Sequence, residues 1–87
     1  MHDLFDLSER VAVLTGVGSG IGKATARTLA RAGATIVGGD VDEGSAQATA
    51  DEIIAEGGNA IVQRTDVTRR TDVDALVDRA AADFVIA

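Results

Sequence analysis

Hydrophobic and polar positions follow one another in blocks that predict three strands, each followed by a helix. The aliphatic runs Val11-Ala12-Val13-Leu14, Thr35-Ile36-Val37 and Ala60-Ile61-Val62 are short, and glycine or polar residues end each of them. Runs of this kind are typical of strands that are buried on both faces of a parallel sheet. We therefore expect three parallel strands at these positions.

The segments that follow the three runs have the three- and four-residue spacing of helices. The first helix is expected from Gly20 to Ala32 with Gly33 as its stop, and the second from Ser45 to Glu56. Thr71, with Asp74 three residues later, is the expected N-cap of the third helix. The expected buried faces are Ile21, Ala24, Thr28, Leu29 and Ala32 in the first helix, Ala46, Ala50, Ile53 and Ile54 in the second, and Val73, Leu76, Val77, Ala80 and Phe84 in the third.

This alternation predicts an α/β fold in the order βαβαβα. Parallel strands need crossover connections, which place helices on the faces of the sheet. The chain has 87 residues, fewer than the ~100–150 of a usual domain. We therefore expect residues 1–87 to form one domain, with a core of small aliphatic side chains.

A glycine-rich turn joins the first strand to the first helix and is the strongest candidate for a binding site. Residues 15–22 read Thr-Gly-Val-Gly-Ser-Gly-Ile-Gly. Gly16 is expected to turn the chain where a side chain would clash, Gly20 to let the backbone approach a pyrophosphate, and Gly22 to let the helix pack closely on the strand. The start of the helix offers N–H groups and a partial positive charge to an anion. The expected phosphate-binding residues are Gly16, Gly18, Ser19, Gly20, Ile21 and Gly22.

The surroundings of this turn favour a dinucleotide over the alternatives. A glycine-rich turn alone also joins strands to helices without any ligand, so its context matters. A P-loop would need a hydroxyl residue after Lys23, where the chain has Ala24. Instead, Asp40 ends the next strand eighteen positions after Gly22, as in dinucleotide-binding folds. The pattern thus predicts half of a doubly wound Rossmann fold.

Asp40, with its neighbour Val41, is the candidate for choosing the cofactor. A carboxylate at this strand end can accept hydrogen bonds from the ribose hydroxyls of an adenosine, whereas it repels a 2′-phosphate. We therefore expect NAD to be preferred over NADP. The alternative is that Asp40 is a solvated residue that merely starts the second helix, a role for which Asp42 is better placed.

Composition and charge exclude several other classes of function. The net charge is −6 with seven Arg and one Lys, which argues against a nucleic acid partner. The chain has no cysteine and a single histidine, His2, so we expect no disulfide and no metal site. Its apolar runs are too short to span a membrane, and its acidic start does not resemble a signal peptide. The default expectation is a cytoplasmic protein.

The segment from Arg10 to Gly22 resembles the opening of short-chain dehydrogenases/reductases, whose turn reads Thr-Gly-x-x-x-Gly-x-Gly. In that family an Asp closing the second strand, matched by Asp40, implies a preference for NAD. An Asp-Val pair after the third strand, matched by Asp66 and Val67, implies contacts with the adenine. For Asp66 the alternative is a simple cap of the following turn.

The resemblance also implies a catalytic Ser and a Tyr-x-x-x-Lys pair, and these have no counterpart here. The chain has no Tyr, and its only Lys is Lys23, so we expect no catalytic residue in it. The leading hypothesis is an NAD-binding or adenosine-nucleotide-binding half-domain that is inactive alone. The alternatives are an oxidoreductase whose catalytic half is absent from this chain, and a structural half-Rossmann dimer that binds nothing.

Without a second half, the first strand would have an unpaired edge. Val11 to Leu14 carries no charge, and such an edge tends to pair with another strand. We therefore expect a homodimer in which two copies of this strand pair about a two-fold axis along the strands and complete the doubly wound sheet.

Overall fold

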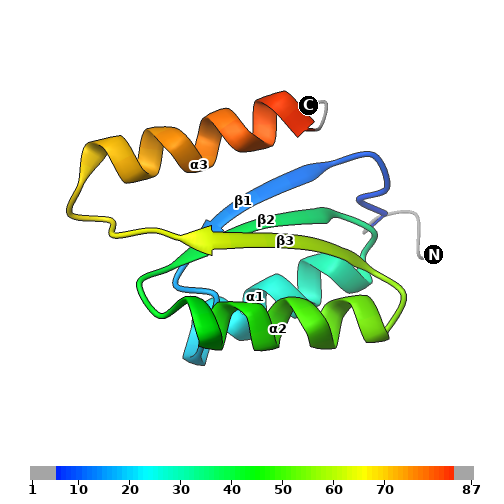
Figure 1. Ribbon diagram of the computed structural model, residues 1–87. Coiled ribbons are helices and arrows are strands. Elements are labelled where there is room, and N and C mark those ends of the chain that lie inside the picture. Colours follow the sequence, from blue (N-terminus) through cyan, green and yellow to red (C-terminus); the bar gives the residue numbers. More distant parts are fainter. Residues whose placement is uncertain (1–5, 84–87) are drawn as a thin grey trace.

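The computed structural model describes residues 6–83, which form three strands and three helices in strict alternation (Figure 1). The elements are β1 (Val11–Thr15), α1 (Gly20–Arg31), β2 (Thr35–Asp40), α2 (Glu43–Ala55), β3 (Asn59–Arg64) and α3 (Arg70–Asp83). The predicted βαβαβα order is therefore confirmed.

The three strands form one parallel sheet in the order β1-β2-β3. Val13 of β1 lies beside Val37 of β2, and Val37 lies beside Ile61 of β3. Within the described residues β2 is the central strand, and β1 and β3 are the edges. Because all strands run the same way, the loops after their carboxyl ends meet at one end of the sheet.

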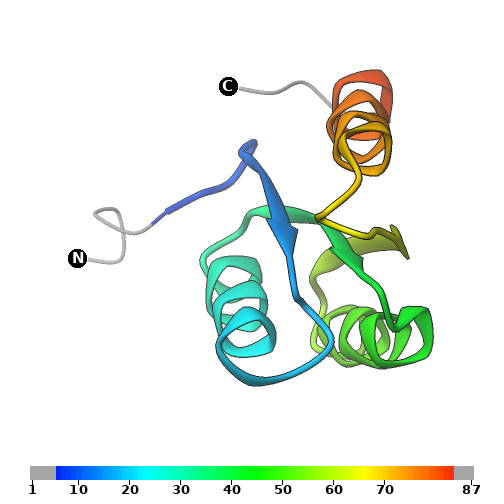
Figure 2. The ribbon, with the colours of Figure 1, turned by 90° about the vertical axis from the view of Figure 1, so that its left-hand side faces the viewer.

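The helices cover both faces of the sheet, as Figures 1 and 2 show. α1 and α2 lie side by side on one face, and α3 lies on the other. The core under α1 and α2 is built mainly from alanines around Ile36 and Ile53, whereas the core under α3 consists of Val37, Leu76 and Ala80. The small side chains let the helices approach the sheet closely, as the composition predicted.

β2 is longer than the sequence predicted because its two glycines belong to the strand. Gly38 and Gly39 pair with Val62 and Gln63 of β3, whereas we expected them to end β2 after Val37. A Cβ on Gly38 would come within 2.9 Å of the Val17 side chain. These glycines therefore serve the close approach of neighbouring segments rather than a turn.

The predicted buried face of α1 is confirmed for Leu29, which packs against the core, and is wrong for three of its other residues. The residues buried in α1 are Ala26 and Ala30, whereas Ile21, Ala24 and Thr28 are exposed. Spacing alone left several stripes possible on a helix so rich in alanine and threonine. The docking onto β1 and β2 selects the smallest side chains. The stop at Gly33 is confirmed, since its φ is +107° and its N–H donates to the Ala30 carbonyl.

The other two helices agree with their predicted faces in part. In α2, Ala46, Ala50 and Ile53 are buried with Thr49, but Ile54 is exposed. In α3, Leu76 and Ala80 are buried, Val73 is half-buried and Val77 is exposed. α3 begins at Arg70, so Thr71 lies inside the helix and is not its N-cap. The predicted contact of Phe84 lies outside the described residues.

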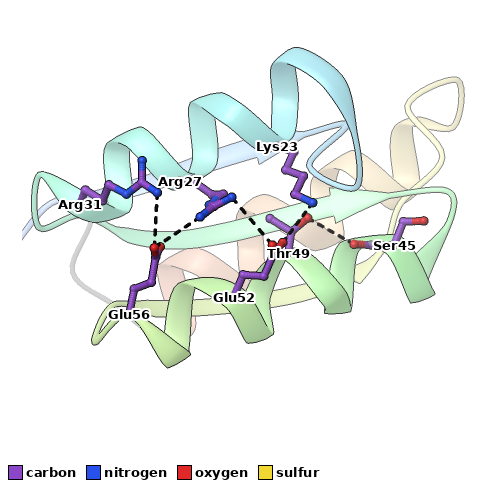
Figure 3. A network of polar contacts seen from close by, with 7 residues as sticks. All are labelled: Lys23, Arg27, Arg31, Ser45, Thr49, Glu52 and Glu56. Atoms are coloured by element: carbon purple, nitrogen blue, oxygen red, sulfur yellow. Dashed lines mark hydrogen bonds and ion pairs between the residues drawn. The ribbon is translucent and has the colours of Figure 1, made fainter.

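A ladder of charged side chains connects α1 to α2 (Figure 3). Lys23 Nζ lies 3.1 Å from Glu52 Oε2, and Arg27 bridges the two acidic residues, 3.8 Å from Glu52 and 3.3 Å from Glu56. Arg31 also reaches Glu56, at 3.4 Å. Such partly exposed pairs contribute little stability one by one. Together they hold α1 in a defined position on α2, and both helices begin beside the candidate site.

Candidate functional site

The carboxyl ends of the three strands surround an open hollow of about 220 Å³. Its wall consists of Gly16 after β1, Asp40 and Val41 at the end of β2, and Thr65, Asp66 and Val67 after β3. Drug-sized ligands occupy pockets of roughly 300–1,000 Å³, so this hollow has room for one part of such a ligand. Except for Thr65, which the sequence analysis missed, every residue of the wall was a predicted site residue.

The two valines of this hollow are largely exposed. Val41 and Val67 are 59% and 60% exposed, although neighbouring valines of the sheet are buried or half-buried. They come from adjacent strand ends and give the hollow an apolar surface that suits a flat ring.

The glycine turn between β1 and α1 depends on two residues with positive φ. Gly16 has φ +69° and Gly20 has φ +58°, which residues with a side chain rarely adopt. A Cβ on Gly16 would meet nothing within 4 Å. The predicted clash at Gly16 is therefore wrong, and its backbone conformation explains the glycine instead.

Gly22 has the packing role that the sequence predicted. A Cβ on Gly22 would overlap the carbonyl oxygen of Gly16 and lie 2.6 Å from its carbonyl carbon. The first turn of α1 therefore touches the backbone of the glycine turn itself. Val17, which the sequence analysis did not single out, is 1% exposed and packs against Gly38 under the turn. The adjacent glycines of β2 were the signal that a bulky neighbour fills this space.

The start of α1 has no side-chain cap. Ser19 is the N-cap residue in an extended conformation, its side chain makes no capping hydrogen bond, and the first turn contains no acidic residue. The first N–H groups of a helix have no acceptor within the helix. Ile21, in this first turn, is 87% exposed. The backbone amides of Gly20 to Gly22 thus offer donors and the positive end of a helix dipole to an anion.

Asp40 ends β2, as predicted, and its carboxylate contacts the glycine turn. The Gly18 N–H donates to Oδ2 of Asp40 at 2.9 Å, and the Asp42 N–H donates to Oδ1 at 3.0 Å. An ionised carboxylate has about four acceptor positions, so two remain for a ligand. The candidate ribose acceptor and the candidate phosphate receptor are therefore joined by a direct hydrogen bond.

Asp42 caps the start of α2, which the sequence analysis named as its better role. The Ser45 N–H donates to Oδ1 at 3.1 Å, and the Ser45 hydroxyl donates to Oδ2 at 2.8 Å. The hydroxyl bond first, and the backbone bond second, lower the pKa of Asp42 below its usual value of 3.8. Because Asp42 caps α2, Asp40 is not needed for this role, and it lies on the wall of the hollow.

Asp66 caps the turn that follows it. One oxygen, Oδ1, accepts from the Thr68 hydroxyl at 2.6 Å and from the Thr68 N–H at 2.9 Å. These bonds, with smaller effects of the Arg64 and Arg69 charges, lower the pKa of Asp66. The Asp66 N–H donates to Asp72 Oδ2 at 3.0 Å, a contact that the sequence analysis missed. The alternative structural role of Asp66 is thus present, and the same turn holds Val67 at the hollow.

Residues 6–83 contain no group of three or more His, Cys, Asp or Glu side chains placed to hold a metal ion. None of the helices described is long and apolar enough to cross a membrane.

A family model described as short chain dehydrogenase matches residues 10–85. The chain belongs to this family. It is 56% identical over 77 residues to cis-4-hydroxycyclohexanecarboxylate dehydrogenase of Sinomonas cyclohexanicum, and 40% identical over 77 residues to cyclohexanol dehydrogenase of Acinetobacter sp. (strain SE19). Each match covers 88% of this chain, but only 30% and 31% of these two family members, respectively.

Solved structures of the family have the same fold over the described region. A hydroxysteroid dehydrogenase from Escherichia coli matches 94% of this chain with a TM-score of 0.90 and 39% identity. A family member from Burkholderia phymatum in complex with NAD matches 91% with a TM-score of 0.86 and 43% identity. These matches cover 35% and 28% of the two solved chains. The chain thus spans about a third of its relatives and corresponds to their amino-terminal, nucleotide-binding part.

Proposed function

We propose that this chain binds the adenosine half of NAD and forms the cofactor-binding part of an NAD-dependent oxidoreductase, without catalytic activity of its own. The observation that carries the proposal is the position of Asp40, which lies on the wall of the hollow and accepts a hydrogen bond from the glycine turn. The solved family member with bound NAD supports the same cofactor class.

The proposed contacts follow from the chemistry of the residues that line the hollow and the glycine turn. The ribose hydroxyls donate to Asp40, the adenine lies between Val41 and Val67, and Asp66 or the Val67 N–H contacts the polar edge of the base. The pyrophosphate accepts from the amides at the start of α1. The proposed phosphate-binding residues are the predicted Gly16, Ser19, Gly20, Ile21 and Gly22, whereas the N–H of Gly18, also predicted there, donates to Asp40 instead.

The preference for NAD rests on the charge of Asp40. Hydrogen bonds to a charged group contribute roughly 1.5–3 kcal/mol. A phosphate charge about 4 Å from a carboxylate is repelled by about 4 kcal/mol at an effective dielectric constant near 20. An NADP 2′-phosphate at the Asp40 wall would therefore lose the hydrogen bonds and add this repulsion.

Isothermal titration calorimetry of the 87-residue chain with NAD, ADP and NADP tests the proposal. We expect ADP and NAD to bind with similar affinity and NADP to bind more weakly. Asp40→Ala should weaken NAD binding about tenfold or more, the loss expected of one charge-assisted hydrogen bond. Asp78→Ala, which removes an exposed carboxylate of α3, is the matched control. Equal affinity for NADP, or no binding of any nucleotide, would contradict the proposal.

The second candidate function is an oxidoreductase whose catalytic half is absent from this chain. It is favoured by the small share of each relative that the chain covers. Relatives about three times as long supply further residues, so the catalytic groups of such an oxidoreductase would come from outside these 87 residues. Adding a separately expressed carboxyl-terminal part of a relative should then restore hydride transfer, followed by NADH absorbance. A chain that folds but binds nothing would favour the purely structural role.

A homodimer through β1 is the proposed partner arrangement. β1 is an edge strand of the described sheet, and its four aliphatic side chains, Val11 to Leu14, are only half-buried. Pairing two copies of β1 would bury this edge and extend the sheet to six parallel strands. Sedimentation at micromolar concentration should show a dimer. A folded monomer under these conditions would contradict the arrangement.

A further inference from the structure

The carboxylate of Asp40 is held by hydrogen bonds at both oxygens before any ligand binds. The Gly18 N–H donates to Oδ2 and the Asp42 N–H donates to Oδ1. A carboxylate held at one oxygen can still rotate about its side-chain bonds. One held at both oxygens, from two different segments of backbone, keeps a single orientation.

Gly18 has no room for a side chain on the side that faces Asp40. A Cβ at Gly18 would lie 2.8 Å from Asp40 Oδ2, 2.8 Å from Ser45 Cβ and 3.2 Å from the Ala46 nitrogen. The first of these contacts is the flexible end of a side chain and can move. The other two belong to the start of α2, which Asp42 and Ser45 hold together by capping. A side chain at Gly18 would therefore displace the Asp40 carboxylate and also push the turn away from the start of α2.

We infer that Gly18 is a positioning residue that sets the cofactor preference through Asp40. Its N–H and the absence of a side chain keep the carboxylate at the hollow, where it meets the ribose and cannot turn away from a 2′-phosphate. A carboxylate that could turn away would discriminate less, because it would relieve the repulsion at small cost. Because the carboxylate is already ordered before binding, NAD binding also needs no further ordering of this side chain. This inference rests on the proposed function of the same site.

The test compares Gly18→Ala with Gly44→Ala by calorimetry. Gly44 lies in the first turn of α2, and a Cβ there would meet only Asp42 Oδ1, at an ordinary 3.5 Å. We expect Gly18→Ala to weaken NAD binding roughly tenfold, as for one lost charge-assisted hydrogen bond, and NADP binding much less. The preference for NAD, given by the dissociation constant of NADP divided by that of NAD, should therefore fall in Gly18→Ala. It should stay unchanged in Gly44→Ala.

A second measurement does not depend on the folding of Gly18→Ala. In ¹⁵N-labelled protein without nucleotide, the amide resonances of Gly18 and Asp42 should both move in Asp40→Ala, which removes the carboxylate that accepts from them. Both resonances should stay in place in the control Asp78→Ala. A Gly18 amide resonance that Asp40→Ala leaves unchanged overturns the inference.

The outcomes separate this inference from the proposal on which it rests. If the parent chain binds NAD in preference to NADP and Gly18→Ala keeps the same ratio, the positioning role is overturned and the proposed function stands. If the parent chain binds neither nucleotide, both are overturned. A reduced ratio in a folded Gly18→Ala variant, with Gly44→Ala unchanged, supports both.

Discussion

Replacement of Gly22 by alanine tests how the glycine turn is built. An added Cβ would overlap the Gly16 carbonyl oxygen and lie 2.6 Å from the Gly16 carbon and 3.3 Å from the Thr15 oxygen. All three atoms belong to the backbone, so no side chain can move aside. α1 or the turn must shift to relieve the overlap.

The expected cost of Gly22→Ala is about 3 kcal/mol in the free energy of unfolding. Overfilling a packed site typically costs about 1–3 kcal/mol, and contacts between rigid backbone segments lie at the upper end. In an open helix the same change would instead stabilise by roughly 0.5–1 kcal/mol. A chain of this length is stabilised by about 4–13 kcal/mol in total, so the variant should lose a large share of its stability.

Urea unfolding followed by circular dichroism measures this difference. With a denaturant dependence of about 1–2 kcal/mol per molar for a small protein, the midpoint should fall by more than about 1 M. Gly44→Ala is the control, since its Cβ meets only the Asp42 carboxylate, at an ordinary 3.5 Å. If Gly22→Ala proves as stable as Gly44→Ala, the close contact between α1 and the glycine turn does not exist in solution.

Three further predictions follow from the core and from the charged caps. Leu76→Ala should destabilise the chain by about 2–5 kcal/mol in urea unfolding because Leu76 is buried, whereas Val77→Ala on the exposed side should change it by less than about 0.5 kcal/mol. The cap at Asp42 stabilises the fold above the usual pKa of 3.8 and should lose this effect as the pH falls through its lowered pKa. Between pH 5 and 2, the free energy of unfolding of Asp42→Asn should therefore depend less on pH than that of the parent protein. The same pH dependence in both would contradict the capping role of Asp42. Glu56 has a pKa lowered first by its hydrogen bond to Arg31, so its contribution is fully present above the usual pKa of 4.5 and is lost as the pH falls through the lowered pKa. Glu56→Gln should flatten the same profile, most clearly at low salt.

The order of strands and helices could be predicted from the sequence because it depends on local patterns. Short β-branched runs predicted the three strands, and Gly33 correctly ended α1. Asp40 was correctly placed at the end of β2, and Asp42 at the start of α2. Each of these features is encoded within a few neighbouring residues, by propensity, capping or the missing side chain of glycine.

The buried face of α1 and the inclusion of Gly38 and Gly39 in β2 could not be predicted in this way. Ala26 and Ala30 face the sheet although the sequence favoured a stripe from Ile21, because burial depends on which side the sheet covers. Gly38 and Gly39 continue β2 because Val17 and Thr65, distant in the sequence, occupy the space beside them.

The sequence by itself determined the βαβαβα order, the glycine turn and the acidic residue that follows β2. Only the tertiary structure decided that Asp40 is clamped between Gly18 and Asp42, and that Thr65 joins the wall of the hollow. The physical reason is the range of the interactions. Helix stops and strand runs are set by neighbours along the chain, whereas the Gly18 to Asp40 hydrogen bond exists only after β1 and β2 have paired in register.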